Sequence, residues 1–272
     1  MPNRCLVLAY HAANVNGVDY ATNDHVALAA DLQTISDAGW RLATLEEVVR
    51  RGLDEPEGDE RLIALSCDDG ISLDYHDFDH PAHGQQPSLR RIVAEYAQAN
   101  LDQTVELTCF VIASAEARAQ LDEKDFMSLG LWPDAWWEPA TRDGLLRIEN
   151  HSWDHNHPSV DPTAQKDQHK GRFEPIDSFA ECEAEIAQSQ DYIAQRSGRR
   201  PQYFAYPWGQ ASDYLRTEYL PNNAKRLGLQ AAFGCDPGLI NARSDRWMLP
   251  RSVCGQQWSS SEELAALLRG YA

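Results

Sequence analysis

Several features are scarce in this chain of 272 residues, and each absence excludes a class of protein. No apolar run approaches the roughly 20 residues that a membrane-spanning helix requires, so we expect no membrane partner. Basic residues are few, because 24 Lys and Arg stand against 42 Asp and Glu and give a net charge of -18. A chain this acidic lacks the clustered positive charge that binds phosphates, so nucleic acid is not an expected partner either.

Signals for export and for disulfide formation are also missing. The first stretch, MPNRCLVLAYHAANVNG, has one basic residue and a short apolar run that stops at His11, unlike a signal peptide. For the chain as it stands we expect a cytoplasmic protein, with export of a trimmed form as the alternative. The cysteines show no CxxC spacing and several lie in apolar runs, so we expect reduced core residues and neither disulfides nor a thiolate metal site. They are Cys5, Cys67, Cys109, Cys182, Cys235 and Cys254.

What the chain does contain is a repeated order of strand and helix. Apolar runs predict strands, and helical patterns follow most of them. The strands are expected at 5–10, 40–44, 61–67, 105–113, 145–150, 202–207 and 230–234, and the helices at 24–39, 45–52, 88–99, around 116, from 178, up to 227 and at 260–270. This order predicts an α/β fold with a mainly parallel sheet, open or closed as a barrel. We expect one domain over 1–272, with irregular insertions near 72–87 and 157–175.

Two polar clusters directly follow predicted strands, where parallel α/β folds place their sites. Asp68 and Asp69 follow the strand at 61–67, although Asp-Asp-Gly is also an ordinary turn. His151 and His155 follow the strand at 145–150, a spacing that lets two imidazoles bind one divalent ion. Together with Asp69 they would form a two-His, one-carboxylate set, which suits hydrolytic zinc and also non-haem iron. Asp154 and His157 are further candidate ligands.

Two weaker clusters follow other strands. Pro207, Trp208 and Gly209 form a rigid turn with exposed backbone amides, which by composition alone is a structural turn packed on Trp208. His11 ends the first strand, where a histidine can act as a general acid but is more often structural.

Together the four clusters resemble the polysaccharide deacetylase family, metal-dependent carbohydrate esterases that remove N-acetyl groups from sugars. LIALSCDDG is similar to the first motif of that family, HSWDH to its His-Ser/Thr-x-x-His motif and YFAYPWG to its third motif. The opening LAYHAA, the helix ending DAGWRLATLEEVV and the late LPRSV are similar to members that carry the usually late histidine motif at the N-terminus. The resemblance implies an irregular (β/α) barrel of about seven strands.

The resemblance also implies roles for individual residues. Asp68 would be the general base and His11 the general acid. Asp69, His151 and His155 would hold one divalent ion, zinc foremost, with Co²⁺, Ni²⁺, Mn²⁺ or Fe²⁺ as alternatives. The backbone amide of Trp208 would help to stabilise the oxyanion. Tyr206, Pro207 and Trp153 are expected beside it on the substrate side.

Three departures from the family pattern change these expectations. Cys67 stands where an aromatic residue usually precedes the Asp pair, and we expect it only to repack the core. Ala205 stands where an Arg usually supports the catalytic Asp. We expect Arg251 of LPRSV to supply that guanidinium, because a fixed cation would keep Asp68 ionised. No late histidine follows LPRSV, so the general acid rests on His11 alone.

The expected function is metal-dependent hydrolysis of an N-acyl group, foremost N-acetyl, from a sugar or oligosaccharide. One alternative is an amidohydrolase of the same fold that acts on a small non-sugar amide or imide, as in allantoinase-like members. Another is a non-catalytic binding member, and strand–helix alternation argues against a non-haem iron oxygenase. Tryptophans near the predicted site could stack on sugars or wall an apolar pocket, namely Trp132, Trp136, Trp137, Trp153 and Trp208. The insertion at 72–87 could cover the site or hold a second metal through His76, Asp77, Asp79, His80 and His83, although a solvated loop is favoured.

Overall fold

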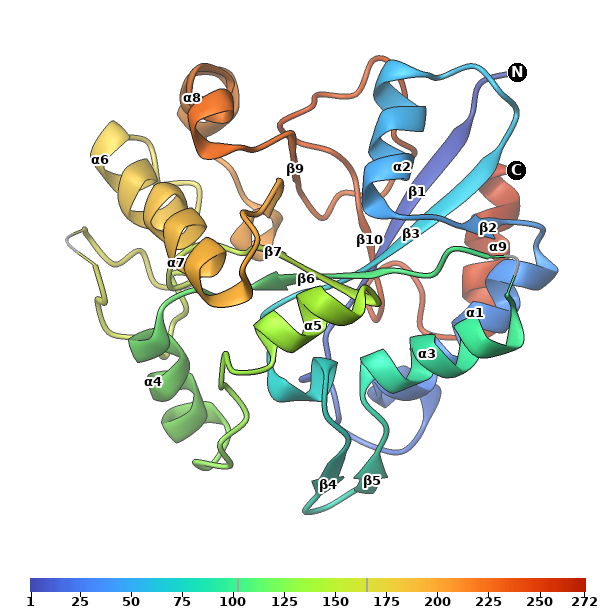
Figure 1. The fold of residues 1–272 in the computed structure, drawn as a ribbon, viewed down its shortest axis with the longest axis horizontal. Helices are drawn as coiled ribbons and strands as arrows, with labels where there is room; N and C mark the ends of the chain where they lie inside the picture. The colour runs from blue at the N-terminus through green and yellow to red at the C-terminus, as the bar shows by residue number, and fades with distance from the viewer. Residues whose placement is uncertain (102, 165) are drawn as a thin grey trace.

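A curled parallel sheet forms the centre of the molecule (Figure 1). The computed structural model describes residues 1–101, 103–164 and 166–272. Along the sheet the strands run in the order β10 (Ser252–Val253), β1 (Arg4–Tyr10), β3 (Arg61–Cys67), β6 (Leu107–Val111), β7 (Leu146–Asn150), β8 (Tyr203–Ala205) and β9 (Ala231–Phe233). A short β2 (Arg41–Leu42) also pairs with β3. Apolar runs buried on both faces are typical of parallel strands covered by helices.

The curl brings the two edges of the sheet toward each other. Leu249 forms a parallel bridge to Phe233 at the end of β9. Three residues later the same segment pairs with β1, where Ser252 lies opposite Leu8. The sequence-based prediction of a single α/β fold with a barrel-like parallel sheet is therefore confirmed, in the form of a half-barrel.

Helices cover the outside of the sheet, and most begin at a side-chain cap. Asn23, Thr44, Ser88, Ser114, Ser178 and Ser260 each accept a hydrogen bond from the first helical turn. The C-terminal helix packs against the first one. The helices are α1 (Asp24–Asp37), α2 (Leu45–Val49), α3 (Leu89–Ala99), α4 (Ala115–Asp125), α5 (Trp137–Asp143), α6 (Phe179–Cys182), α7 (Gln188–Ser197), α8 (Leu220–Leu227) and α9 (Ser261–Tyr271).

Alternate residues of each strand enter different parts of the core. On β1, Leu6, Leu8 and Tyr10 belong to the large cluster that includes residues of α1 and α9. Cys5 and Val7 belong to a second cluster with Phe233 and other strand residues. Side chains alternate between the two faces of the sheet along each strand. We therefore expect neighbouring polar residues just beyond a strand end, such as Asp68 and Asp69, to have different surroundings.

The structure differs from the sequence-based expectation in several places. The segment 72–87 is not irregular, because it contains a short hairpin of β4 (Phe78–His80) and β5 (Gly84–Gln86). The second insertion, in its described parts 157–164 and 166–175, has no helix or strand. Helix α5 was not predicted. No helix in the described ranges combines the length and apolar character needed to cross a bilayer.

A buried ion pair on β7 supports the strand that leads into the histidine cluster. Glu149 is fully buried and accepts hydrogen bonds from Arg147 Nε at 2.6 Å and from the Tyr203 N–H at 2.7 Å. Glu149→Ala should destabilise the fold by about 3–5 kcal/mol, because it removes the buried carboxylate partner of Arg147. Arg147 would keep only the exposed Glu46 as an acidic partner, and the Tyr203 N–H would be left without its acceptor. Urea unfolding would measure the change. Glu138→Ala, which breaks an exposed pair on α5, is the matched control and should have little effect. Equal effects of both substitutions would contradict the argument.

Candidate active site

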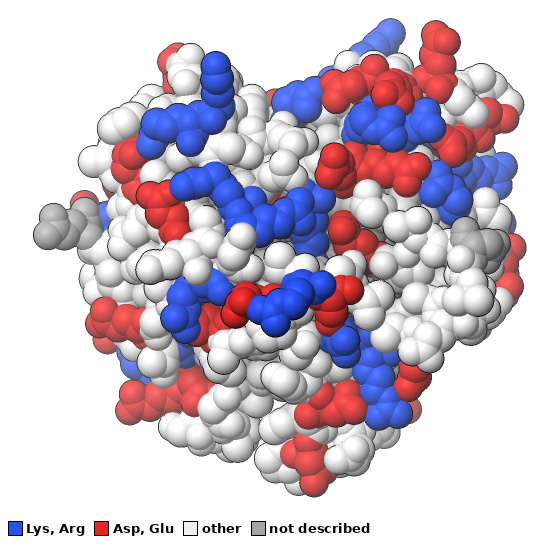
Figure 2. Space-filling view, in the orientation of Figure 1, with Lys and Arg blue, Asp and Glu red and all other residues white. Residues whose placement is uncertain are grey.

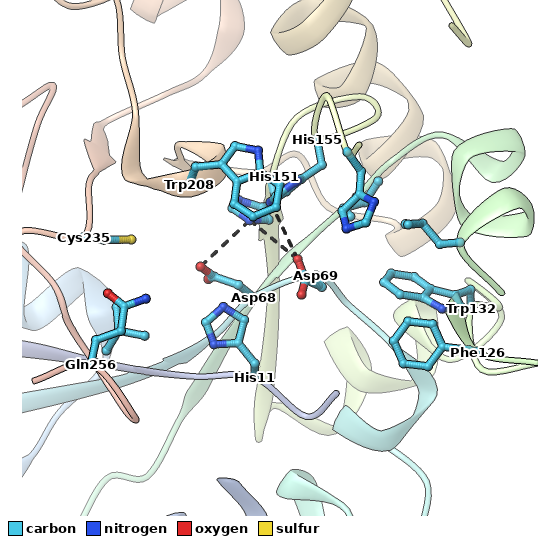
Figure 3. Close-up of a pocket in the computed structure, with 14 residues that line it drawn as sticks. His11, Asp68, Asp69, Phe126, Trp132, His151, His155, Trp208, Cys235 and Gln256 are labelled. Atoms are coloured by element: carbon cyan, nitrogen blue, oxygen red, sulfur yellow. Dashed lines mark ion pairs between the residues drawn. The ribbon is translucent and has the colours of Figure 1, made fainter. Parts of the chain in front are cut away.

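Side chains from the ends of five parallel strands meet at one edge of the sheet. His11 follows β1, Asp68 and Asp69 follow β3, and His151 follows β7. The register makes neighbours of them, because Tyr10 lies opposite Cys67 and the Asp68 N–H donates to the Tyr10 carbonyl. Trp208 follows β8 and Cys235 follows β9. The six residues that follow the strands line one cavity of about 320 Å³, namely His11, Asp68, Asp69, His151, Trp208 and Cys235 (Figure 3).

Asp69, His151 and His155 form a donor set that fits a divalent ion. One potential ligand atom from each lies within 4.8 Å of the other two. The Nε2 atoms of both histidines are 3.8 Å from Asp69 Oδ1. Donors about 2.0–2.1 Å from a tetrahedral zinc ion lie about 3.4 Å apart, so a small contraction would complete the set.

The environment of the two histidines keeps their rings neutral, as metal ligation requires. Burial lowers the pKa of His151 and, together with its histidine neighbours, lowers the pKa of His155 well below the usual value. His151 Nδ1 lies 2.8 Å from the Ala205 carbonyl oxygen. A proton on Nδ1 that donates to this carbonyl leaves Nε2 free to face Asp69. Residues at this centre therefore fit a metal ion both in position and in protonation.

A buried polar network holds the loop that carries both histidines. Asn150 Oδ1 accepts from the Ser152 N–H and from Ser189 Oγ, and Ser152 Oγ accepts from the His155 N–H at 2.9 Å. Lys166, whose side chain is fully buried, pairs with Asp154 at 3.3 Å. The loop is thus fixed from both sides by contacts that do not involve an ion.

Asp68, next to the metal-ligating candidate, has a different partner. Arg251 donates to it twice, from Nη1 at 2.6 Å and from Nη2 at 2.8 Å. Arg251 is itself held by the Gly234 carbonyl at 3.1 Å and lies 5.1 Å above the Phe110 ring. Burial alone would raise the pKa of Asp68, but the charge of Arg251 and its two hydrogen bonds outweigh that effect and hold the pKa well below its usual range. Asp68 is therefore ionised.

His11 and Trp208 complete the wall of the cavity. Figure 3 shows the His11 ring beside Asp68. Its Nδ1 is buried and has no hydrogen-bond partner among the described residues. The Trp208 ring packs edge-on against His155 with centroids 4.7 Å apart, and its backbone has a left-handed φ of 60°.

Some residues expected at or near the site do not line this cavity. Trp153 does not line the cavity, because its Nε1 donates to the Thr163 carbonyl and its ring packs on Tyr192. Tyr206 is fully buried and donates to the Trp247 carbonyl. Several other candidates also lie outside the cavity wall, namely Pro207, Trp136, Trp137, His76, Asp77, Asp79, His80 and His83.

The two further candidate ligands also differ from expectation. Asp154 faces away from the donor set, because its oxygens accept from Thr163 Oγ1 and the Asn156 N–H. His157 lines the cavity but lies outside the group of three donors, stacked on Trp208.

Of the residues that shape the two ends of the cavity, the sequence placed only Trp132 near the site. Figure 3 shows Cys235 and Gln256 at one end and Phe126 and Trp132 at the other, with the donor set between them. Ile112 and Leu121 extend the apolar end. Trp132 could be found from the sequence because it is one of the tryptophans near the predicted site. The other residues at the cavity ends belong to segments without a polar motif, so nothing in the sequence indicated them.

Three comparisons place the chain among known proteins. A family model described as polysaccharide deacetylase matches residues 55–232. Comparison with curated proteins gives no match. Among solved structures, the chain is similar to IcaB from Ammonifex degensii, with a TM-score of 0.68 and 15% identity over 98% of this chain and 97% of that one.

Two other solved structures are similar over nearly their full length. The Streptococcus pyogenes deacetylase PplD, in complex with acetate, has a TM-score of 0.64 and 16% identity, and covers 98% of this chain and 99% of its own. A de-N-acetylase from Aggregatibacter actinomycetemcomitans has a TM-score of 0.60 and 16% identity, and covers 97% of this chain and 100% of its own. At such identities these likenesses show the fold.

Removing one donor should abolish tight metal binding. Changes to residues that only support a ligand already lower metal affinity about 10–100-fold, so loss of Asp69 or His155 should cost more than that. Isothermal titration of Asp69→Ala and His155→Ala with Zn²⁺ would measure it. His157→Ala, in the same cavity but outside the donor group, is the control and should bind like the parent chain. Unchanged affinity in both donor variants would refute the assignment.

Proposed function

The chain belongs to the polysaccharide deacetylase family, and we propose that it is a metal-dependent hydrolase that removes an N-acyl group, foremost N-acetyl, from a sugar or oligosaccharide. One observation carries the proposal. An ionised carboxylate, an uncommitted imidazole and a two-His, one-Asp donor set share one cavity of about 320 Å³. Amide hydrolysis needs a base, an acid and an electrophile within reach of the same bond.

Asp68 is the base that accepts a proton from the attacking water. Its two contacts with Arg251 keep it ionised and fix its orientation. Asp69, His151 and His155 hold the divalent ion, which when bound supplies Lewis acidity to water and to the acyl oxygen. Zinc suits this nitrogen and oxygen donor set with open positions.

His11 is the acid that protonates the departing nitrogen, because an amine is a poor leaving group without a proton. It lies on the opposite side of Asp68 from the backbone of Trp208 in Figure 3. The amide of Trp208, in a turn fixed by the Gly209 N–H to Tyr206 carbonyl bond, stabilises the oxyanion. Both His11 and Arg251 lie outside the residues matched by the family model.

The cavity favours a small acyl group on a compact amine. Its volume is near the lower end of the range for small-molecule sites, about 300–1,000 Å³, so one sugar unit fills it. Its apolar end, at Phe126 and Trp132, suits a methyl group or a sugar face. The S. pyogenes relative was solved with acetate, which is consistent with acetyl transfer to water.

Substrate screening of the zinc-loaded protein tests the proposal. We expect acetate release from N-acetylated chitooligosaccharides or peptidoglycan fragments. Cyclic amides are tested in parallel. If only the cyclic amides were hydrolysed, the proposal would be wrong and the activity would be imidase-like. Binding of the sugars without any acetate release, in protein that holds its metal, would indicate a non-catalytic member.

Loss of the base or the acid should abolish turnover without loss of metal. Asp68→Asn and His11→Ala should each lower kcat by about 10²–10⁴, the usual contribution of general acid–base catalysis. Metal content measured on the same samples should stay at the parent level. Asp79→Asn and His76→Ala, outside the cavity, are the matched controls. Full activity in either test variant refutes the role of that residue.

Arg251 should set the pH range in which Asp68 works as a base. Without the guanidinium, burial is the dominant influence and raises the pKa of Asp68. The acid limb of the kcat/KM profile should then move to higher pH in Arg251→Met, with activity lost first at low pH. Arg251→Lys keeps a charge and should shift the limb less. Superimposable profiles for all three proteins would contradict this role.

A further inference from the structure

A second cluster of donor atoms lies behind the catalytic turn, on the side of the sheet covered by helices. Cys67 and Cys109 are in register on the neighbouring strands β3 and β6, and their Sγ atoms are 3.2 Å apart. Asp74 ends a short 3-10 turn, Ser72–Asp74, that folds back over them. One donor atom from each of the three lies within 4.8 Å of the other two.

Asp74 has no counterpart for its charge. It is fully buried, and neither carboxylate oxygen has a hydrogen-bond partner among the described residues. Its surroundings are apolar, with Ile71, Leu73 and Leu89 in the same core cluster as both cysteines. A buried carboxylate without a partner is strongly unfavourable, so this one requires either a cation or a proton.

We propose that Cys67, Asp74 and Cys109 bind a second divalent ion of the zinc class, separate from the catalytic centre. Two sulfurs and one carboxylate oxygen suit zinc, cobalt or cadmium, whereas magnesium and calcium require oxygen-rich sets. Two thiolates and one carboxylate carry three negative charges. A divalent ion neutralises two of these charges, whereas a monovalent ion neutralises only one. The buried position of all three donors makes the site a closed, structural one.

The donor spacing requires only a small adjustment. Sulfurs about 2.3 Å from a tetrahedral zinc ion lie about 3.7 Å apart, so the thiols of Cys67 and Cys109 separate by about half an ångström. These three side chains leave one position of a tetrahedral ion for a further ligand. The ion joins β3, β6 and the turn after Gly70, and Cys67 directly precedes Asp68. It therefore braces the base of the catalytic turn, and the inference does not depend on the catalytic proposal.

The stoichiometry and spectrum of bound cobalt test the site. Because the site is closed, the protein is refolded in Co²⁺ or Zn²⁺ and freed of excess ion. We expect two equivalents per chain and a near-ultraviolet sulfur-to-cobalt charge-transfer band. In His155→Ala, which lacks the catalytic centre, one equivalent and the band should remain.

Variants assign the band to these donors. Cys109→Ala and the nearly isosteric Asp74→Asn should each lose the band and one equivalent. Cys235→Ala is the essential control, because that thiol lines the catalytic cavity and its removal should leave the band unchanged. One equivalent without a band in the parent chain overturns the proposal and leaves Asp74 as a protonated core carboxyl. The parent spectrum decides the question even if Cys109→Ala does not fold.

Discussion

The structure of the site depends on the buried pair between Asp68 and Arg251, which lie 183 residues apart. Removing two charges from water is costly, and here the cost is offset by two parallel hydrogen bonds and by the Gly234 carbonyl that holds the guanidinium. The pair joins the end of β3 to the segment that approaches both edges of the curled sheet. The contact between the sheet edges and the ionised state of Asp68 therefore depend on the same pair.

This contact makes two adjacent carboxylates chemically different. Asp68 is buried and neutralised by a fixed cation, whereas the Asp69 side chain is 23% exposed and faces two imidazole nitrogens. Two like charges at neighbouring positions repel unless each has its own partner. Arg251 neutralises Asp68, and a cation from solution would neutralise Asp69. The proposed division between base and metal ligand rests on these environments, since the two side chains are chemically identical. Charges of both signs are interspersed on the face in Figure 2.

The features that could be predicted from the sequence are those set by a single strand, namely its position and the polar residues at its end. Apolar runs located β1, β3, β6 and β7, and polar residues at their ends identified His11, Asp68 and His151. The sequence could not predict contacts that depend on register between strands or on loop direction. Trp153 and Tyr206 belong to the recognised motifs but face away from the cavity. Cys67 and Cys109 are separated by 42 residues, and only the pairing of β3 with β6 brings them together. Spacing rules for cysteines therefore could not find this pair of neighbouring thiols.

The backbone conformations around the cavity indicate that the site is preformed. Of the eight non-glycine residues with positive φ in the described chain, Asp69, Ser152, His155, Asn156 and Trp208 lie in the loops around the cavity. Such conformations are costly for residues with a Cβ and persist only where surrounding contacts determine them. For the histidine loop those contacts are the hydrogen bonds of Asn150 and Ser152 and the buried Lys166 pair, none of which requires a metal. The loop thus has the shape that the proposed metal site needs without an ion, so the binding energy of an ion would not be used to order it.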